Sequence, residues 1–159
     1  MKPSSELELL DEHSVRTSAD PVRVWDALPE GIAAAFDRPR GRAIADLLGC
    51  RDRRAAAPFR PIEGATIPGF RVARSDPPRE IALEGRHRFS RYRLTFEIEP
   101  RESGSRIRAV THARFPGVRG ALYRSLVVGS GGHRIVTRRI LKSIARRAER
   151  AHRHRKEEA

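Results

Sequence analysis

The sequence predicts an α+β fold in which one curved antiparallel sheet is covered by a long C-terminal helix. Apolar residues alternate along residues 91–99 and again along 106–115, on either side of a Glu-Ser-Gly-Ser turn at 102–105. From residue 133 to 152 the apolar residues recur instead at helical spacing. A strand pattern in residues 7–17 leads directly into a helix start. This order of elements favours a sheet and a helix packed face to face.

Composition bounds the class of protein. The chain has 159 residues, which fits one domain, and 38% of them are apolar. A single cysteine, Cys50, permits no internal disulfide, and no apolar run is long enough to span a bilayer. Glu6 and Glu8 lie where a signal peptide would need apolar residues. We expect a cytoplasmic protein with a disordered lead (1–6), one domain (7–152) and a charged, disordered tail (153–159).

The chain is strongly basic, with 33 Lys and Arg against 20 Asp and Glu, a net charge of +13. Between Arg138 and Lys156 there are nine basic residues and one acid, Glu149. Such a patch attracts nucleic acid, ribosomes or anionic lipid in a salt-dependent way. Almost all the basic residues are Arg, so a composition bias on a solvated surface is the competing explanation.

The first half of the chain combines a strand with two helices. Asp20 is the predicted N-cap of a short helix that begins at Pro21 and carries Val22, Trp25 and Leu28 on one face. A second helix is predicted over residues 40–48 and ends at a glycine. Its apolar face is expected to hold Ile44, Leu47 and Leu48.

The middle of the chain is predicted to be mostly strands. Residues 50–64 contain two prolines and read as an irregular connector. A strand is expected over 65–74, interrupted by Pro68-Gly69, and another over 80–89, with a turn at 75–78 between them.

The last forty residues are predicted to be helical. Residues 117–128 form a short amphipathic segment that ends at a Gly-Ser-Gly-Gly stretch. In the long helix that follows, two opposite faces are expected. The apolar face holds His133, Thr137, Ile140, Leu141, Ile144 and Ala148, and the basic face holds Arg139, Lys142, Arg146, Arg150 and Arg153.

Three segments resemble a known family. Residues 18–28, Ser-Ala-Asp-Pro-Val-Arg-Val-Trp-Asp-Ala-Leu, are similar to the opening that follows the first strand in the START-type (SRPBCC, polyketide cyclase/dehydrase-like) superfamily. Residues 83–92 resemble a bacterial branch of that superfamily. So does Phe115-Pro116-Gly117 with Tyr123-Arg124 and the Gly131-Gly132-His133 helix start. The resemblance implies a helix-grip fold around an apolar cavity, and members that bind lipids, sterols or polyketides or act as cyclases.

The strand count departs from the family pattern. The sequence predicts about five strands, whereas the family has more. We therefore expect residues 50–64 to supply a missing edge strand, or the sheet to be short.

The predicted ligand site lies on the apolar face of the sheet and on the helix that covers it. Its wall is expected to include Ile81 and Ile107 together with the ligand-binding candidates Trp25, Leu83, His87, Tyr92, Leu94, Phe96, Ala109, Thr111, Phe115, Tyr123, Arg124, His133, Thr137 and Ile140. Alternation alone does not separate a lined cavity from a filled core, so both interpretations stay open.

His87 and Tyr92 are the candidates for chemistry. Both are expected on the inner face, where a histidine and a phenol could hydrogen-bond a ligand or act as acid and base. The alternative is a structural His87 bonded to the backbone near the Phe89-Ser90 bend. His133 could gate the cavity or satisfy strand ends, and Arg124 could pair with a ligand anion or be solvated.

No other site type is indicated. His112 is expected to be exposed, and the six histidines show no metal spacing, so neither a metal nor a cofactor is predicted. The Gly-Ser-Gly-Gly stretch lacks the lysine of a P-loop and is interpreted as a hinge.

Three functions remain. The favoured hypothesis is non-catalytic binding of a small hydrophobic molecule. The alternatives are a polyketide cyclase- or dehydratase-like enzyme and an RNA- or ribosome-associated module that uses residues 138–156. A monomer or a homodimer paired through the sheet edge is expected.

Overall fold

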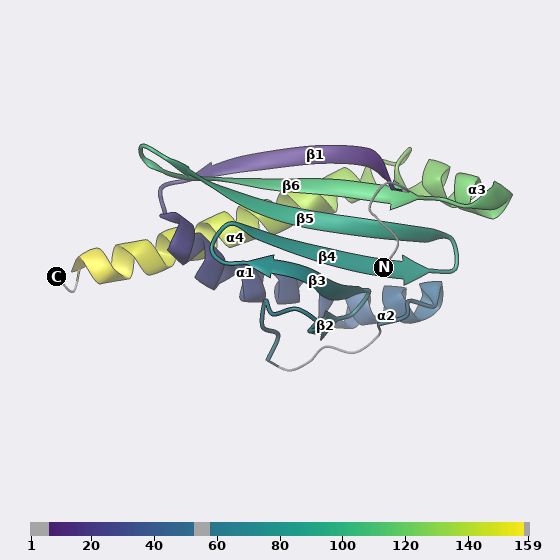
Figure 1. The fold of residues 1–159 in the computed structure, drawn as a ribbon, viewed down its shortest axis with the longest axis horizontal. Coiled ribbons are helices and arrows are strands. Elements are labelled where there is room, and N and C mark those ends of the chain that lie inside the picture. The colour runs from purple at the N-terminus through teal and green to yellow at the C-terminus, as the bar shows by residue number, and fades with distance from the viewer. Residues whose placement is uncertain (1–6, 53–57, 158–159) are drawn as a thin grey trace.

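The computed structural model describes residues 7–52 and 58–157. The elements follow in the order β1 (Glu8–Thr17), α1 (Pro21–Phe36), α2 (Pro39–Leu48), β2 (Thr66–Ile67), β3 (Phe70–Asp76), β4 (Glu80–His87), β5 (Ser90–Arg101), β6 (Gly104–Arg114), α3 (Gly117–Val127) and α4 (Gly132–Glu157). The strands form one antiparallel sheet in the order β1-β6-β5-β4-β3-β2, and α1 and α4 cover one of its faces (Figure 1). The predicted helix-grip α+β architecture is confirmed.

The predicted meander is also confirmed. In the β5–β6 pair, Phe96 lies opposite Ala109 and Ile98 lies opposite Ile107. These four side chains are at most 4% exposed, because the alternating pattern turns them all toward the helices. The apolar face of the sheet therefore forms the floor of the hydrophobic core.

The long helix α4 presents the faces that its periodicity predicts. Ile140, Leu141 and Ile144 are buried against the sheet and α1, and the predicted basic residues are exposed. Gly31 on α1 lets the two helices approach closely, since a Cβ there would lie 2.4 Å from Cγ1 of Ile144. The structure continues α4 as helix to Glu157, through residues that the sequence assigned to a disordered tail.

The first helix is longer than predicted and buries a different face. Its N-cap is Asp20, as expected, with the side chain accepting a hydrogen bond from the Arg23 amide. The helix continues past Pro29 to Phe36, and Val22 is 58% exposed. The buried side is formed by Val24, Leu28, Gly31 and Ile32, since contact with α4 stabilises the turns that follow the proline.

The apolar face predicted for the second helix is wrong. The bounds of α2 agree with the prediction, and Gly49 ends it with a left-handed φ of 66°. Ile44 and Leu47 are nevertheless 57% and 78% exposed, and Ala45 is the buried residue. Leu48, the third predicted residue, is half-buried. The one buried side chain of α2 is the small Ala45, which the spacing of the larger residues did not indicate.

The sixth strand does not come from the connector. It is β2, which pairs with β3 across the Pro68-Gly69 interruption. The described parts of the connector, residues 50–52 and 58–64, contain no strand. Residues 1–6, predicted to be a disordered lead, lie outside the described residues.

Candidate functional site

Five half-buried rings meet at the end of the sheet where β4 turns into β5. The ring of His87 lies 5.5 Å from that of Tyr92 and 4.9 Å from that of Tyr123. Phe89 stacks on Tyr123 at 5.5 Å with an interplanar angle of 25°, and Phe115 lies 6.3 Å from the same ring. We call these five residues the aromatic cluster. Four of the five are predicted site residues. They are His87 on β4, Tyr92 on β5, Tyr123 on α3 and Phe115 in the segment just before α3.

Glycines allow this cluster to form. At Gly85 on β4, a Cβ would lie 2.3 Å from Cε2 of Tyr92 and 2.2 Å from the Gly69 carbonyl oxygen. Gly120 on α3 is buried, and its Cβ would lie 3.1 Å from the Phe89 carbonyl oxygen. The room that Gly85 leaves beside His87 is occupied by the phenol ring of Tyr92.

The imidazole of His87 is bonded within its own hairpin. The Phe89 amide donates to Nδ1 at 3.1 Å, so the neutral ring carries its proton on Nε2, which lies 3.0 Å from the Ser90 hydroxyl. Burial lowers the pKa of His87 and keeps the ring neutral. These contacts support the structural role that was the alternative to acid–base chemistry.

The phenol of Tyr92 is bonded as well. Its Oη donates to the Gly69 carbonyl at 2.7 Å and lies 3.8 Å from Sγ of the buried Cys50. Burial, followed by the nearby Cys50, raises the pKa of Tyr92 far above its usual range. Cys50 joins this site only through tertiary packing, because no partner lies near it in the sequence.

A second, polar group of residues lies under the N-terminal turns of α4. Nε2 of His133 is 3.1 Å from Oγ1 of Thr111 and 3.4 Å from Oδ1 of Asp11. The other carboxylate oxygen of Asp11 is 3.3 Å from Nε2 of His13, which is 8% exposed. Thr137 donates from its hydroxyl to the backbone carbonyl of His133 at 3.0 Å.

Only part of this polar group was predicted from the sequence. Thr111, His133 and Thr137 were predicted as site residues, whereas Asp11 and His13 were missed. The signal was present, since both have the same parity along β1 as the buried Thr17. The β-bulge between Leu9 and Asp11 shifts the register only before Asp11, so Asp11, His13 and Thr17 stay in one alternation.

The other predicted site residues differ in how deeply they are buried. Leu83, Leu94, Phe96, Ala109 and Ile140 belong to one packed hydrophobic core, against which Trp25 lies partly buried. The side chain of Arg124 is exposed on α3. His112 is half-buried rather than exposed, and its Nδ1 is inaccessible and has no hydrogen-bond partner. Contact of the core residues with a ligand stays a prediction.

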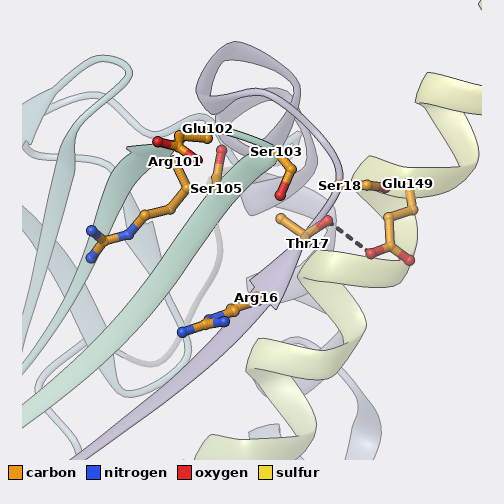
Figure 2. Close-up of a pocket in the computed structure, with 8 residues that line it drawn as sticks. All are labelled: Arg16, Thr17, Ser18, Arg101, Glu102, Ser103, Ser105 and Glu149. Carbon is orange, nitrogen blue, oxygen red and sulfur yellow. Dashed lines mark hydrogen bonds between the residues drawn. The ribbon is translucent and has the colours of Figure 1, made fainter.

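An open pocket of about 680 Å³ lies at the opposite end of the sheet from the aromatic cluster. Figure 2 shows its eight lining residues: Arg16, Thr17, Ser18, Arg101, Glu102, Ser103, Ser105 and Glu149. The Thr17 hydroxyl donates to Oε1 of Glu149 at 3.0 Å, and the side chains of Arg16 and Arg101 point away from that bond (Figure 2). This polar pocket includes none of the predicted site residues.

The described residues provide neither a metal site nor a membrane-spanning helix. Within residues 7–52 and 58–157, no three His, Cys, Asp or Glu side chains are placed to hold a metal ion. In the same part of the chain, no helix combines the length and the apolar character needed to cross a bilayer.

Comparison with known proteins shows a shared fold. No protein-family model matches the chain, and no curated protein matches its sequence. Among solved structures, protein CV1439 from Chromobacterium violaceum is 15% identical with a TM-score of 0.55, over 87% of this chain and 96% of that chain. An uncharacterised protein from Rhizobium leguminosarum is 17% identical with a TM-score of 0.59, over 91% and 96% of the two chains.

The Polyketide_cyc-like protein Cgl2372 from Corynebacterium glutamicum is also similar, at 16% identity and a TM-score of 0.47, over 92% of this chain and 96% of that chain. The chain shares its fold with CV1439 and with the Rhizobium leguminosarum protein over most of its length.

Proposed function

We propose that this protein binds a small hydrophobic molecule without transforming it, between the sheet and α4 at the end where α3 crosses the β4–β5 hairpin. The observation that carries the proposal is the aromatic cluster. Its five rings are neither buried nor fully exposed, and Tyr92 joins them to Phe70, which packs against the hydrophobic core. Half-buried aromatic side chains supply a large apolar contact area at little conformational cost, which is what an apolar ligand requires.

Binding without catalysis is supported by the bonding of the two candidate acid–base residues. Both nitrogens of His87 have partners within the hairpin, and the phenol of Tyr92 donates to a backbone carbonyl. Their perturbed pKa values follow from burial and keep both groups neutral near pH 7. A general acid or base has to exchange a proton with substrate, and here the polar atoms are already engaged.

Native mass spectrometry tests binding. Protein purified without added ligand should carry a discrete mass excess that disappears on denaturation. Nile red should bind saturably, and Tyr123→Ala should weaken that binding about tenfold, because one large ring is removed from the site. The control is Val22→Ser, an exposed aliphatic at the other end of the molecule. Absence of both a mass excess and Tyr123-dependent dye binding would refute the proposal.

A cyclase- or dehydratase-like activity is favoured by one observation, the carboxylate of Asp11 beside His133. That pair could move a proton from an inner-face position. If the bound molecule is identified, incubation with the protein should return it unchanged. Conversion that is lost in Asp11→Asn and retained in His87→Phe would establish the enzyme alternative at the polar group instead.

An RNA-associated role is favoured by the exposed basic face of α4. Deleting the helix end would also remove the buried Ala148 and the bond from Thr17 to Glu149, so charge variants are the cleaner test. For RNA binding through α4, Lys142→Gln/Arg150→Gln should reduce the salt-dependence slope by about 1.5. The control Arg60→Gln/Arg79→Gln removes the same charge from exposed positions elsewhere. Equal effects of the two pairs would exclude a specific role for α4.

A further inference from the structure

The aliphatic side of helix α3 is exposed to water. Its buried or half-buried side consists of Gly120 and Tyr123, which contact the β4–β5 hairpin and the aromatic cluster. On the other side, Val118, Leu122 and Leu126 are 88%, 73% and 70% exposed. Their spacing of four residues places them in one stripe along the helix. The amphipathic pattern predicted for this segment is therefore present, but it does not cover the core.

Two further exposed aliphatic residues lie at the start of α4. Ile135 and Val136 are 53% and 47% exposed on its first turns. In Figure 1, α3 lies at the opposite end of the molecule from the C-terminal end of α4 and projects past the strands. Isolated exposed aliphatics are ordinary on protein surfaces, whereas a run of five on two consecutive helices marks an interaction surface.

The charged residues on α3 and on the first turns of α4 have one sign. From Ser103 to Ala148 the chain has eleven Lys and Arg and no Asp or Glu. Arg119 and Arg124 on α3 and Arg134 and Arg138 on α4 are all exposed. The partner that complements this surface has to be apolar at its centre and anionic around it.

We infer that α3 and the first turns of α4 dock onto an anionic lipid surface. The aliphatic stripe enters the boundary between headgroups and acyl chains, and the arginines pair with lipid phosphates. With 11 residues, α3 is too short to cross a bilayer and lies in the plane of the interface. A second copy of the chain fits less well, because it would oppose two surfaces of the same positive charge. RNA fits less well because the exposed side chains of the stripe are aliphatic and offer no stacking platform.

The test is co-sedimentation of the full chain with vesicles of two compositions. One is phosphatidylcholine alone, and the other is an equimolar mixture with phosphatidylglycerol. Binding is expected only to the anionic vesicles and should weaken as salt rises. Val118→Ser/Leu122→Ser should reduce the partition coefficient by at least about tenfold with no change in charge. The matched control, Val22→Ser, should bind as the unmodified chain does.

The charge contribution is tested separately. Arg119→Gln/Arg124→Gln should reduce binding about 25-fold, since each basic residue near an anionic surface contributes about fivefold. Arg60→Gln/Arg79→Gln removes the same charge far from α3 and should have a much smaller effect.

Three results would overturn the inference. The first is no binding to anionic vesicles by the folded chain. The second is binding that Val118→Ser/Leu122→Ser leaves unchanged, because attraction through the net charge alone would then explain it. The third is a dimer, or an RNA complex, that these substitutions abolish while vesicle binding is absent. Circular dichroism of each variant confirms that the fold is retained, as expected for substitutions at exposed positions.

Discussion

The substitution Gly85→Ala adds one methyl group beside the aromatic cluster and so tests how tightly that cluster is packed. The Gly69 oxygen that a Cβ would approach accepts the hydrogen bond from Tyr92, and the phenol ring packs on Phe70 at 5.0 Å and on His87. Neither neighbour is the free end of a flexible side chain. In Gly85→Ala the ring and the carbonyl therefore have to separate, and the Tyr92 hydrogen bond is expected to break.

The expected cost follows from three contributions. Overpacking in a tight interior costs about 1–3 kcal/mol, and leaving a half-buried hydrogen-bonding group without its partner costs about another 1–3 kcal/mol. Replacing a glycine within a strand recovers roughly 0.5–1 kcal/mol of backbone entropy. The net expectation is a loss of about 3 kcal/mol in the free energy of unfolding. For a chain of this length, that lowers the melting temperature by about 6–12 °C.

Thermal unfolding followed by circular dichroism measures the stability. Ultraviolet titration of the two tyrosines measures the local effect, because the pKa of Tyr92 should fall toward 10 once the phenol is less buried. Gly132→Ala is the control, since its Cβ would approach only the Ser130 hydroxyl, at 3.4 Å. A Gly85→Ala protein as stable as the unmodified chain, with an unchanged tyrosine titration, would refute this account of the site.

Three further predictions concern the fold and its pH dependence. Gly31→Ala should lower the free energy of unfolding in urea by about 1–2 kcal/mol. Combined with Ile144→Ala it should cost less than the sum of the two single changes, because Ile144→Ala removes the atom that a Cβ at position 31 would meet. Additive costs would contradict the close approach of α1 and α4. Asp20→Ala should cost about 1 kcal/mol through loss of the N-cap. The hydrogen bond from the Arg23 amide lowers the pKa of Asp20, so the stabilisation by the Asp20 carboxylate is complete above about pH 4 and is lost as the pH falls further. An acid-unfolding curve that Asp20→Ala leaves unchanged would argue against this N-cap. Burial lowers the pKa of His87, so below pH 6.5 the unfolded chain takes up the proton first and stability should fall with pH. His87→Gln should flatten that slope, and NMR titration of the His87 ring at or above the ordinary value would disprove the assignment.

Local patterns in the sequence were sufficient for the sheet and for α4. Alternation placed Leu94 and Phe96 on the inner face, because a strand turns successive side chains to opposite sides and only one side of this sheet is covered. The same reasoning placed His87 and Tyr92 together. The N-cap at Asp20 was predictable because a capping side chain bonds to an amide only three residues away.

The sequence by itself therefore determined the α+β class, the inner and outer faces of the strands and the two faces of α4, all of which depend on residues within a few positions of one another. Tertiary structure alone decided which helix faces found a partner. The apolar side of α3 and Leu47 of α2 remain in water, while α1 continues past Pro29 because α4 packs against it. It also decided which distant polar groups meet, as Asp11 and His13 do with His133, and Cys50 with Tyr92. Those outcomes depend on contacts between segments far apart in the chain, which no local spacing encodes.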